Sequence, residues 1–257
     1  MIGMFDKNKK TGTSAVQTVA RALALLETVA EGVRELDALA KRTGLSRSTA
    51  HRLLTALTRE GYLRHRPREG YYLGPKLIRL GFLAHKQLHL PAIARPHLEW
   101  LRDQTSETVH LAVLEGTEVV YIEKIPGHRE LQFASYIGAR LPAQSTALGK
   151  AILAHFPEEE WKVHFIPGLK RTPRTISDFA QFREELLRTR ERGYALDLEE
   201  NEPGVRCIGA PVWDGSGRVV AAVSVSSAAV YLDDERIPRV AELVKEAAFR
   251  ISQELGG

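Results

Sequence analysis

Hydrogen-bond donors are concentrated in one short stretch of the chain, residues 46–59, at intervals that match the turn of a helix. If this stretch is helical, Ser48, His51 and Thr55 lie on one side of it and cover that side with polar groups. A helix that enters the major groove of DNA contacts base edges and phosphates through such donors near its N-terminus. We therefore predict DNA contacts from Ser46, Arg47, Ser48, Thr49, His51, Arg52 and Thr55.

A second group of cationic side chains follows in residues 62–73. Two aromatic or branched runs flank the turn-forming residues 67–70 (PREG), which predicts a β-hairpin with an arginine at its tip. A helix pair followed by such a hairpin is a winged helix, so His65, Arg66 and Arg68 are predicted to contact the DNA backbone or the minor groove. The alternative, a solvated amphipathic helix in an ordinary helical domain, leaves the hairpin unexplained.

The elements that would position these donors lie in the same region. Leu36, Leu39 and Ala40 have helical spacing, and Gly44 ends that helix because glycine tolerates the positive φ of a tight turn. Ser46 can then cap the second helix. The predicted buried face of that helix consists of Ala50, Leu53, Leu54 and Leu57. Residues 36–74 therefore predict a winged helix-turn-helix.

Charge is distributed unevenly along the chain. The 257 residues carry a formal net charge of +4, but residues 1–75 contain 13 Lys or Arg against 7 Asp or Glu, or +6, which leaves −2 for the remainder. A basic module on a slightly acidic body indicates a domain that meets phosphates. No basic amphipathic helix with aromatic residues on its apolar face is present, which argues against binding to a membrane surface.

The cellular compartment can also be predicted from the sequence. No uninterrupted apolar run approaches the ~20 residues that span a bilayer, and residues 1–13 are too polar and basic for a signal peptide. The single cysteine, Cys207, cannot form an intramolecular disulfide. We therefore expect a cytoplasmic protein.

Periodicity divides the chain into four segments. We expect a mobile N-terminal arm in residues 1–13, the winged helix-turn-helix in 14–75, a linker helix in 76–91 and an α+β domain in 92–257. Within the last segment, strands are expected in a hairpin over 108–123 and over 131–136, 205–213 and 219–226. Helices are expected over 96–104, from 145, and over 158–165, 179–192 and 233–255. Strands in hairpins with helices segregated around them predict an antiparallel sheet.

Five segments carry a more specific signal. They are residues 39–54 (LAKRTGLSRSTAHRLL), 72–77 (YLGPKL), 107–111 (ETVHL), 146–151 (TALGKA) and 193–211 (GYALDLEENEPGVRCIGAP). In this order, and over residues 16–255, the chain closely resembles the IclR family of bacterial transcriptional regulators, named after the isocitrate lyase regulator. A single helix-turn-helix segment is common, but five segments in the family's order make a strong match.

The resemblance implies a fold and a function. The fold is a winged-helix DNA-binding domain joined by a linker helix to an α+β effector-binding domain similar to GAF domains. Family members typically form homodimers, often dimers of dimers, that bind double-stranded operator DNA. Their DNA binding responds to a small metabolite, often a carboxylate. We therefore expect a transcriptional regulator of a metabolic operon, a repressor rather than an activator, controlled by a small organic acid.

The resemblance also implies a metabolite site in the C-terminal domain. In the family, the residues matching Ala147 and Leu148 supply backbone amides, and the residue matching Asp197 bonds a polar group of the ligand. Amides at a helix N-terminus suit a carboxylate, which gives this expectation a chemical basis. The expected effector site is Thr146, Ala147, Leu148, Asp197, Val205, Cys207, Ser224 and Ser226.

One position departs from the family pattern. Many relatives carry a histidine two residues after a proline, whereas this chain has Gln144 two residues after Pro142. The substitution argues against a metal held with Asp197 and Cys207. We expect no metal and no cofactor.

Several of these residues also have a purely structural interpretation. Cys207 could be a small buried hydrophobe, Asp197 a helix cap or a surface acid, and His110 a structural histidine. Ser224 and Ser226 share one face of a strand, which could be the solvent face.

Two other classes of function are weaker. An enzyme would use Cys207 as nucleophile and His110 as base, but the sequence has no glycine-rich phosphate loop, zinc-spaced histidine pair or nucleophile elbow. A ligand-independent architectural DNA-binding protein would not need the large C-terminal domain. We therefore expect no enzymatic activity.

Overall fold

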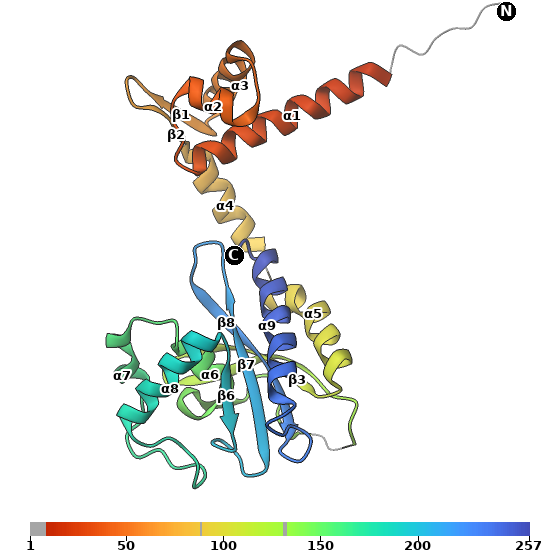
Figure 1. Cartoon of the computed structure of the whole chain (residues 1–257), viewed down its shortest axis with the longest axis vertical. Helices are drawn as coiled ribbons and strands as arrows, with labels where there is room; N and C mark the ends of the chain where they lie inside the picture. The colour runs from red at the N-terminus through yellow and green to blue at the C-terminus, as the bar shows by residue number, and fades with distance from the viewer. Residues whose placement is uncertain (1–8, 88, 131–132) are drawn as a thin grey trace, which may run out of the picture. The chain divides into compact units, whose positions relative to one another are not determined.

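The first third of the chain folds as helices with one β-hairpin (Figure 1). The structure, a computed structural model, describes residues 9–87, 89–130 and 133–257, and the chain divides into two units, Met1–Gln87 and Leu88–Gly257. The first unit contains α1 (Lys9–Ala30), α2 (Leu36–Thr43), α3 (Arg47–Arg59), β1 (Leu63–Arg66), β2 (Gly70–Leu73) and α4 (Pro75–Gln87).

The turn between α2 and α3 has the predicted geometry. Gly44 adopts a φ of 66°, and its N–H reaches the carbonyl groups of Ala40 and Lys41. The Ser46 side chain accepts a hydrogen bond from the backbone N–H of Thr49 and so caps α3. Of the predicted buried face, Ala50, Leu53 and Leu54 are buried, and Leu57 packs half-buried against the same cluster. The predicted winged helix-turn-helix is confirmed.

The second unit is built on one antiparallel sheet. Its strands are β3 (Thr108–Glu115), β4 (Glu118–Ile125), β5 (Arg140–Pro142), β6 (Ala195–Leu198), β7 (Val205–Trp213) and β8 (Val219–Ala228), in the order β5-β4-β3-β8-β7-β6. Its helices are α5 (Leu90–Thr105), α6 (Ala147–Leu153), α7 (Trp161–His164), α8 (Phe179–Arg192) and α9 (Ile237–Glu254), with short 3-10 turns at Ala143–Ser145 and Glu158–Glu160. The predicted α+β fold is confirmed.

Different helices cover the two faces of the sheet. Val223 and Val225 of β8 belong to the cluster under α5 and α9, whereas Ala222 belongs to the cluster under α6 and α8. Because side chains alternate along a strand, Ser224 and Ser226 point to the same face as Ala222. The face beside α6 therefore carries hydroxyl groups in the middle of the sheet.

Two glycines allow α6 to lie close to its neighbours. A Cβ atom on Gly149 would lie 2.1 Å from the Ala143 carbonyl oxygen, and one on Gly209 of β7 would lie 2.7 Å from the Ala147 carbonyl oxygen. Neither approach leaves room for a side chain. The N-terminus of α6 is thereby held between the turn at Ala143–Ser145 and the sheet.

The structure differs most from the prediction at three places. Helix α1 begins at Lys9, inside the predicted arm, and residues 1–8 of that arm lie outside the described residues. Residues 133–136 form no strand, residues 131–132 lie outside the described part, and the outer partner of β4 is instead β5. Helix α5 begins at Leu90 and contains Pro96, whereas the predicted helix began at residue 96.

The lengths and compositions of the helices also bear on membrane insertion. Within residues 9–87, 89–130 and 133–257, no helix combines the length and the apolarity that a bilayer-spanning segment requires.

Candidate DNA interface and ligand cavity

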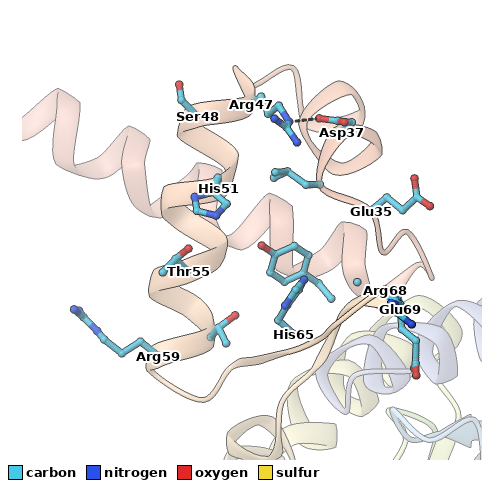
Figure 2. A pocket seen from close by; sticks show the side chains of 14 residues that line it. Glu35, Asp37, Arg47, Ser48, His51, Thr55, Arg59, His65, Arg68 and Glu69 are labelled. Atoms are coloured by element: carbon cyan, nitrogen blue, oxygen red, sulfur yellow. Dashed lines mark hydrogen bonds and ion pairs between the residues drawn. The ribbon is translucent and has the colours of Figure 1, made fainter.

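The outward face of α3 carries exposed polar side chains (Figure 2). Ser48, His51 and Thr55 are exposed and border a groove between α3 and the hairpin, and Arg52 is exposed in a second hollow beside it. Six of the ten predicted DNA-contacting residues line the groove: Arg47, Ser48, His51, Thr55, His65 and Arg68.

The register of the hairpin places His65 at this groove. Leu63 pairs with Leu73 and His65 with Tyr71, so Leu63, His65 and Tyr71 share the face that packs on the helices. The His65 and Tyr71 rings lie 4.7 Å apart. Arg68 lines the groove from the hairpin tip with a φ of 67°, a conformation that costs a non-glycine residue about 1–2 kcal/mol.

Five of the ten residues have hydrogen-bond partners within the unit. The Arg47 Nε atom donates to Asp37 Oδ1 at 2.6 Å, as Figure 2 shows, and Arg66 Nη1 donates to Glu69 Oε2 at 3.1 Å. Ser46 and Thr49 are joined in the cap of α3, and the Ser48 Oγ atom lies 3.2 Å from Ser46 Oγ. These five side chains therefore also hold local structure, whereas His51, Arg52 and Thr55 present exposed polar groups on one helix.

A cavity of about 640 Å³ lies in the second unit, beside α6 and the serine-bearing face of the sheet. Its size falls in the range of about 300–1,000 Å³ typical of small-molecule sites. All eight residues of the expected effector site line it: Thr146, Ala147, Leu148, Asp197, Val205, Cys207, Ser224 and Ser226. The sheet register explains part of this, because Cys207 lies opposite both Asp197 and Ser226 on its two neighbouring strands.

Asp197 is a buried acid with backbone donors. Its Oδ1 atom accepts hydrogen bonds from the N–H groups of Glu200 at 2.7 Å and Asn201 at 3.3 Å. Burial raises the pKa of Asp197 to about 7, and the Glu200 charge adds to this, against the opposing effect of Lys150. The proposed alternative of a surface acid does not apply, because Asp197 is 2% exposed.

Lys150 and Glu200 form an ion pair behind this acid. The Lys150 side chain on α6 is fully buried, and its Nζ atom donates to Glu200 Oε1. The other oxygen of Glu200, Oε2, is buried without a hydrogen-bond partner among the described residues. Burial raises the pKa of Glu200. One buried cation thus faces two buried carboxyl groups.

Cys207 and His110 form a neutral wall of the cavity. The Cys207 Sγ atom donates to Ser226 Oγ at 3.2 Å, and burial raises the pKa of the thiol. His110 lies with Nδ1 3.4 Å from Ser226 Oγ and Nε2 2.8 Å from Ser135 Oγ. Burial, with a smaller effect of the Lys124 charge, lowers the pKa of His110 to about 3. A protonated thiol beside a neutral imidazole lacks the thiolate that nucleophilic catalysis requires.

Several cavity residues were not predicted from the sequence. His110 was assigned a structural role, yet it lines the cavity and stacks on Tyr121 with ring centroids 4.5 Å apart. Arg171 lines the cavity from an exposed loop. Phe133, Asn201 and Glu202 also belong to this group. Because they come from separate strands and loops, no local spacing pattern could have grouped them.

Gln144 has a structural role. Its side chain is fully buried, with Nε2 donating to the Ile176 carbonyl oxygen and Oε1 accepting from the Ile166 N–H, both at 2.7 Å. It does not line the cavity. Among the described residues no group of three or more His, Cys, Asp or Glu side chains is arranged to hold a metal ion.

Comparisons with known proteins cover both units. Residues 18–67 match the IclR helix-turn-helix domain, and residues 82–253 match the family described as bacterial transcriptional regulator IclR C-terminal. The chain is 39% identical over 247 residues to the HTH-type transcriptional regulator XynR of Escherichia coli, covering 94% of this chain and 98% of XynR. It is 33% identical over 252 residues to the transcriptional repressor IclR of E. coli, covering 95% of this chain and 92% of IclR.

Solved structures give the same result. The Agobacterium tumefaciens repressor BlcR matches with a TM-score of 0.79 and 32% identity, covering 94% of this chain and 98% of BlcR. The IclR protein of Thermotoga maritima matches with a TM-score of 0.64 and 34% identity, covering 94% of this chain and 100% of that protein. Both units of the chain share the fold of these two proteins.

Proposed function

The chain belongs to the IclR family of DNA-binding transcriptional regulators, and from this membership we propose that it represses a metabolic operon under the control of a small organic acid. It is a regulator rather than an enzyme, as its named relatives are. Repression is favoured because relatives include the transcriptional repressor IclR of E. coli and the acetate operon repressor of Salmonella typhimurium.

The helix-turn-helix binds DNA. In the proposed complex a homodimer, or a dimer of dimers, places the α3 helices of two chains in successive major grooves of a nearly palindromic operator. Ser48, His51 and Arg52 would meet base edges, and Arg68 of the hairpin would meet the backbone or minor groove. The wider proposed interface is Ser46, Arg47, Ser48, Thr49, His51, Arg52, Thr55, His65, Arg66 and Arg68.

The observation that carries the effector proposal is the meeting of all eight expected residues at one cavity. They come from α6 and three strands, so their convergence depends on the whole effector domain, residues 92–257. A cavity that combines one buried acid, several hydroxyl groups and an apolar wall can orient a small polar ligand.

The N-terminus of α6 favours an acidic ligand. Two hydrogen bonds close its first turn. The Gly149 N–H donates to Thr146 Oγ1 at 3.1 Å, and the Lys150 N–H donates to the Thr146 carbonyl oxygen. Ala147 and Leu148 line the cavity, and their N–H groups precede those bonds, so in the proposed complex they donate to a carboxylate. A hydroxyl or oxo group of the same ligand can then reach Asp197, Cys207 or Ser226.

Ligand binding would alter operator affinity by linkage. If the metabolite has different affinities for two arrangements of the domains, it shifts their populations, and the affinity for DNA changes with them. Helix α4, within the expected linker of residues 76–91, is the connection across which the shift would act.

The test is a ligand screen on the full chain. Small carboxylates, keto acids, sugar acids and aromatic acids would be compared by thermal shift and titration calorimetry. A true effector should bind the wild-type protein and the control Glu159→Ala, whose exposed carboxylate lies outside the cavity, but not Asp197→Ala. If no compound binds and none alters DNA affinity, the C-terminal domain is not a sensor of such acids and a ligand-independent architectural role is favoured.

A further inference from the structure

Tyr72 of the hairpin brings together three charged side chains near the hairpin tip. Its hydroxyl group accepts a hydrogen bond from Arg34 Nη1 at 2.6 Å and donates one to Glu69 Oε2 at 3.0 Å. The Arg34 and Arg66 guanidinium carbons lie 4.1 and 4.7 Å from the centroid of the Tyr72 ring. Arg66 Nη1 also donates to Glu69 Oε2, at 3.1 Å. We call Arg34, Arg66, Glu69 and Tyr72 the wing clamp.

The backbone adds to the wing clamp at Arg34. The Arg34 carbonyl oxygen accepts a hydrogen bond from the Tyr71 N–H at 2.9 Å. A Cβ atom on Gly70 would lie 2.3 Å from that oxygen, so only glycine permits the approach. The loop between α1 and α2 therefore holds the second strand of the hairpin through both backbone and side-chain contacts.

Glu69 carries a negative charge at a surface proposed to meet phosphates. The hydrogen bonds from Arg66 and Tyr72 lower its pKa, so the carboxylate stays ionised at neutral pH. Glu69 lines the groove beside α3. An unpaired carboxylate there would repel DNA, because charges of like sign raise the free energy of association. Arg66 is placed to neutralise it.

Arg68 differs from Arg66 in its contacts. Among the described residues Arg68 makes no ion pair, and its left-handed backbone at the tip directs it to the groove. Arg66 is instead bound to Glu69 and lies over Tyr72. Of the two arginines of the hairpin tip, Arg66 is therefore held by contacts within the hairpin, whereas Arg68 is free of ion pairs among the described residues and lines the groove.

We propose that Arg66 is a positioning residue for DNA binding: with Arg34 and Tyr72 it holds Glu69 against the hairpin, and Arg68 is the arginine of the tip that contacts phosphate. This assignment rests on the proposed DNA interface and changes the role expected for Arg66 within it. The energetic effect of an exposed ion pair is small, so the consequence lies in orientation and local charge.

A double-mutant cycle on Arg66 and Glu69 tests the proposal. The full chain would be titrated against a fluorescent DNA duplex of arbitrary sequence over a series of KCl concentrations, for the wild type, Arg66→Ala, Glu69→Gln and the double variant. Arg66→Ala should weaken binding about threefold, because it releases the Glu69 charge. The double variant should bind as tightly as Glu69→Gln alone, because no charge remains to be released.

The salt dependence separates the two arginines. Each lost phosphate contact lowers the magnitude of the negative slope of log K against log salt concentration by about 0.9. Arg68→Ala should show this change, whereas Arg66→Ala and Tyr72→Phe should weaken binding with the slope unchanged. A double variant as impaired as Arg66→Ala, with a slope smaller in magnitude by about 0.9, would show that Arg66 contacts phosphate itself and would overturn the proposal. So would an Arg66→Ala variant that binds as the wild type does.

Two controls keep the result interpretable. Thermal unfolding of each variant shows whether the hairpin substitutions unfold the domain, and Tyr72→Phe tests the wing clamp while keeping the aromatic ring. Arg52→Glu, which reverses a charge on α3, tests the DNA interface as a whole, because it should weaken binding to DNA of any sequence. If Arg52→Glu and Arg68→Ala both bind normally, the proposed interface is misplaced. If both are impaired but Arg66 and Glu69 show no coupling, only the role of Arg66 is wrong.

Discussion

Asp197 shows how a single residue can serve both the ligand cavity and the fold. Its carboxyl group is buried beside one cation, Lys150, which is already paired with Glu200. Other titratable groups line the same cavity, among them Cys207, Tyr121 and Glu202. Burial, with the Glu200 charge adding to it, disfavours the ionised carboxylate, which explains why the pKa of Asp197 lies well above its ordinary value.

This elevated pKa predicts a pH-dependent stability that one substitution should remove. The pKa of Asp197 is about 7 in the folded chain against 3.8 ordinarily, so the folded state binds the proton more tightly. The stabilisation is present below pH 3.8 and is lost as pH rises through about 7, with a limit of about 4 kcal/mol. Asp197→Asn, which resembles the protonated acid, should flatten the decline in melting temperature between those values. Parallel pH profiles for wild type and variant would contradict the assignment.

Arg52 offers a test of base reading within α3. It is exposed, and among the described residues it makes no ion pair. If it reads guanine, Arg52→Ala should weaken binding to an operator fragment by about 1–3 kcal/mol and weaken binding to random DNA much less. Competition binding with both duplexes measures the difference. Equal losses on the two would show that Arg52 contacts phosphate alone.

The residues of the two candidate sites were predictable to different degrees. The donors of α3 follow from helical spacing alone, because a helix fixes which residues share a face. The effector-site residues were predicted through the family resemblance, since Ala147, Asp197 and Ser226 are far apart in sequence. His110 and the wing clamp were missed, because cross-strand pairing and contacts such as that between Arg34 and Tyr72 appear only after folding.

At the scale of elements, two helical glycines should respond in opposite ways to the same substitution. Gly149→Ala would place a Cβ atom 2.1 Å from the Ala143 carbonyl oxygen, which must displace α6 from the adjacent turn. We expect a loss of about 1–3 kcal/mol. A Cβ atom on Gly81 of α4 would meet no neighbouring side chain or element within 4 Å among the described residues, so Gly81→Ala should stabilise the helix by about 0.5–1 kcal/mol.

Urea unfolding of the two glycine variants measures this difference. The same variants separate packing from ligand binding, because Gly149 borders the α6 N-terminus whereas Gly81 lies in the other unit. Gly149→Ala should also weaken ligand binding in the cavity, and Gly81→Ala should leave it unchanged. A Gly149→Ala variant as stable as the wild type would mean that the Ala143–Ser145 turn relaxes without cost.

Elements with strong periodicity were predictable, and those defined by pairing or by proline were not. Helix α9 and strands β7 and β8 follow from their apolar patterns. Strand β5 has three residues and is defined by its pairing with the start of β4, which leaves no signal in its own sequence. Helix α5 was predicted to start late because Pro91 suggests a break, yet proline is tolerated in a first helical turn.

At the scale of the whole molecule, the two units divide charge as well as structure. Residues 1–75 carry a net charge of +6 and the remaining residues a net charge of −2. The positive charge is therefore concentrated in the part of the chain that contains the helix-turn-helix. DNA binding should therefore weaken as salt increases, whereas binding of a ligand in the cavity of the second unit should depend on salt much less. The cavity and the DNA interface can thus be titrated separately in one chain.

If the proposed switch operates, coupling between the two sites must be reciprocal. A ligand that lowers operator affinity by some factor requires that operator DNA lower the ligand's affinity by the same factor. For a typical coupling free energy of about 1–3 kcal/mol, that factor is about 5–150. Calorimetry with the ligand alone and with the preformed DNA complex gives one factor, and DNA titrations with and without ligand give the other. The control Asp197→Ala should bind DNA normally and show no coupling. Unequal factors would mean that a third process, such as a change in assembly, accompanies one of the two binding events.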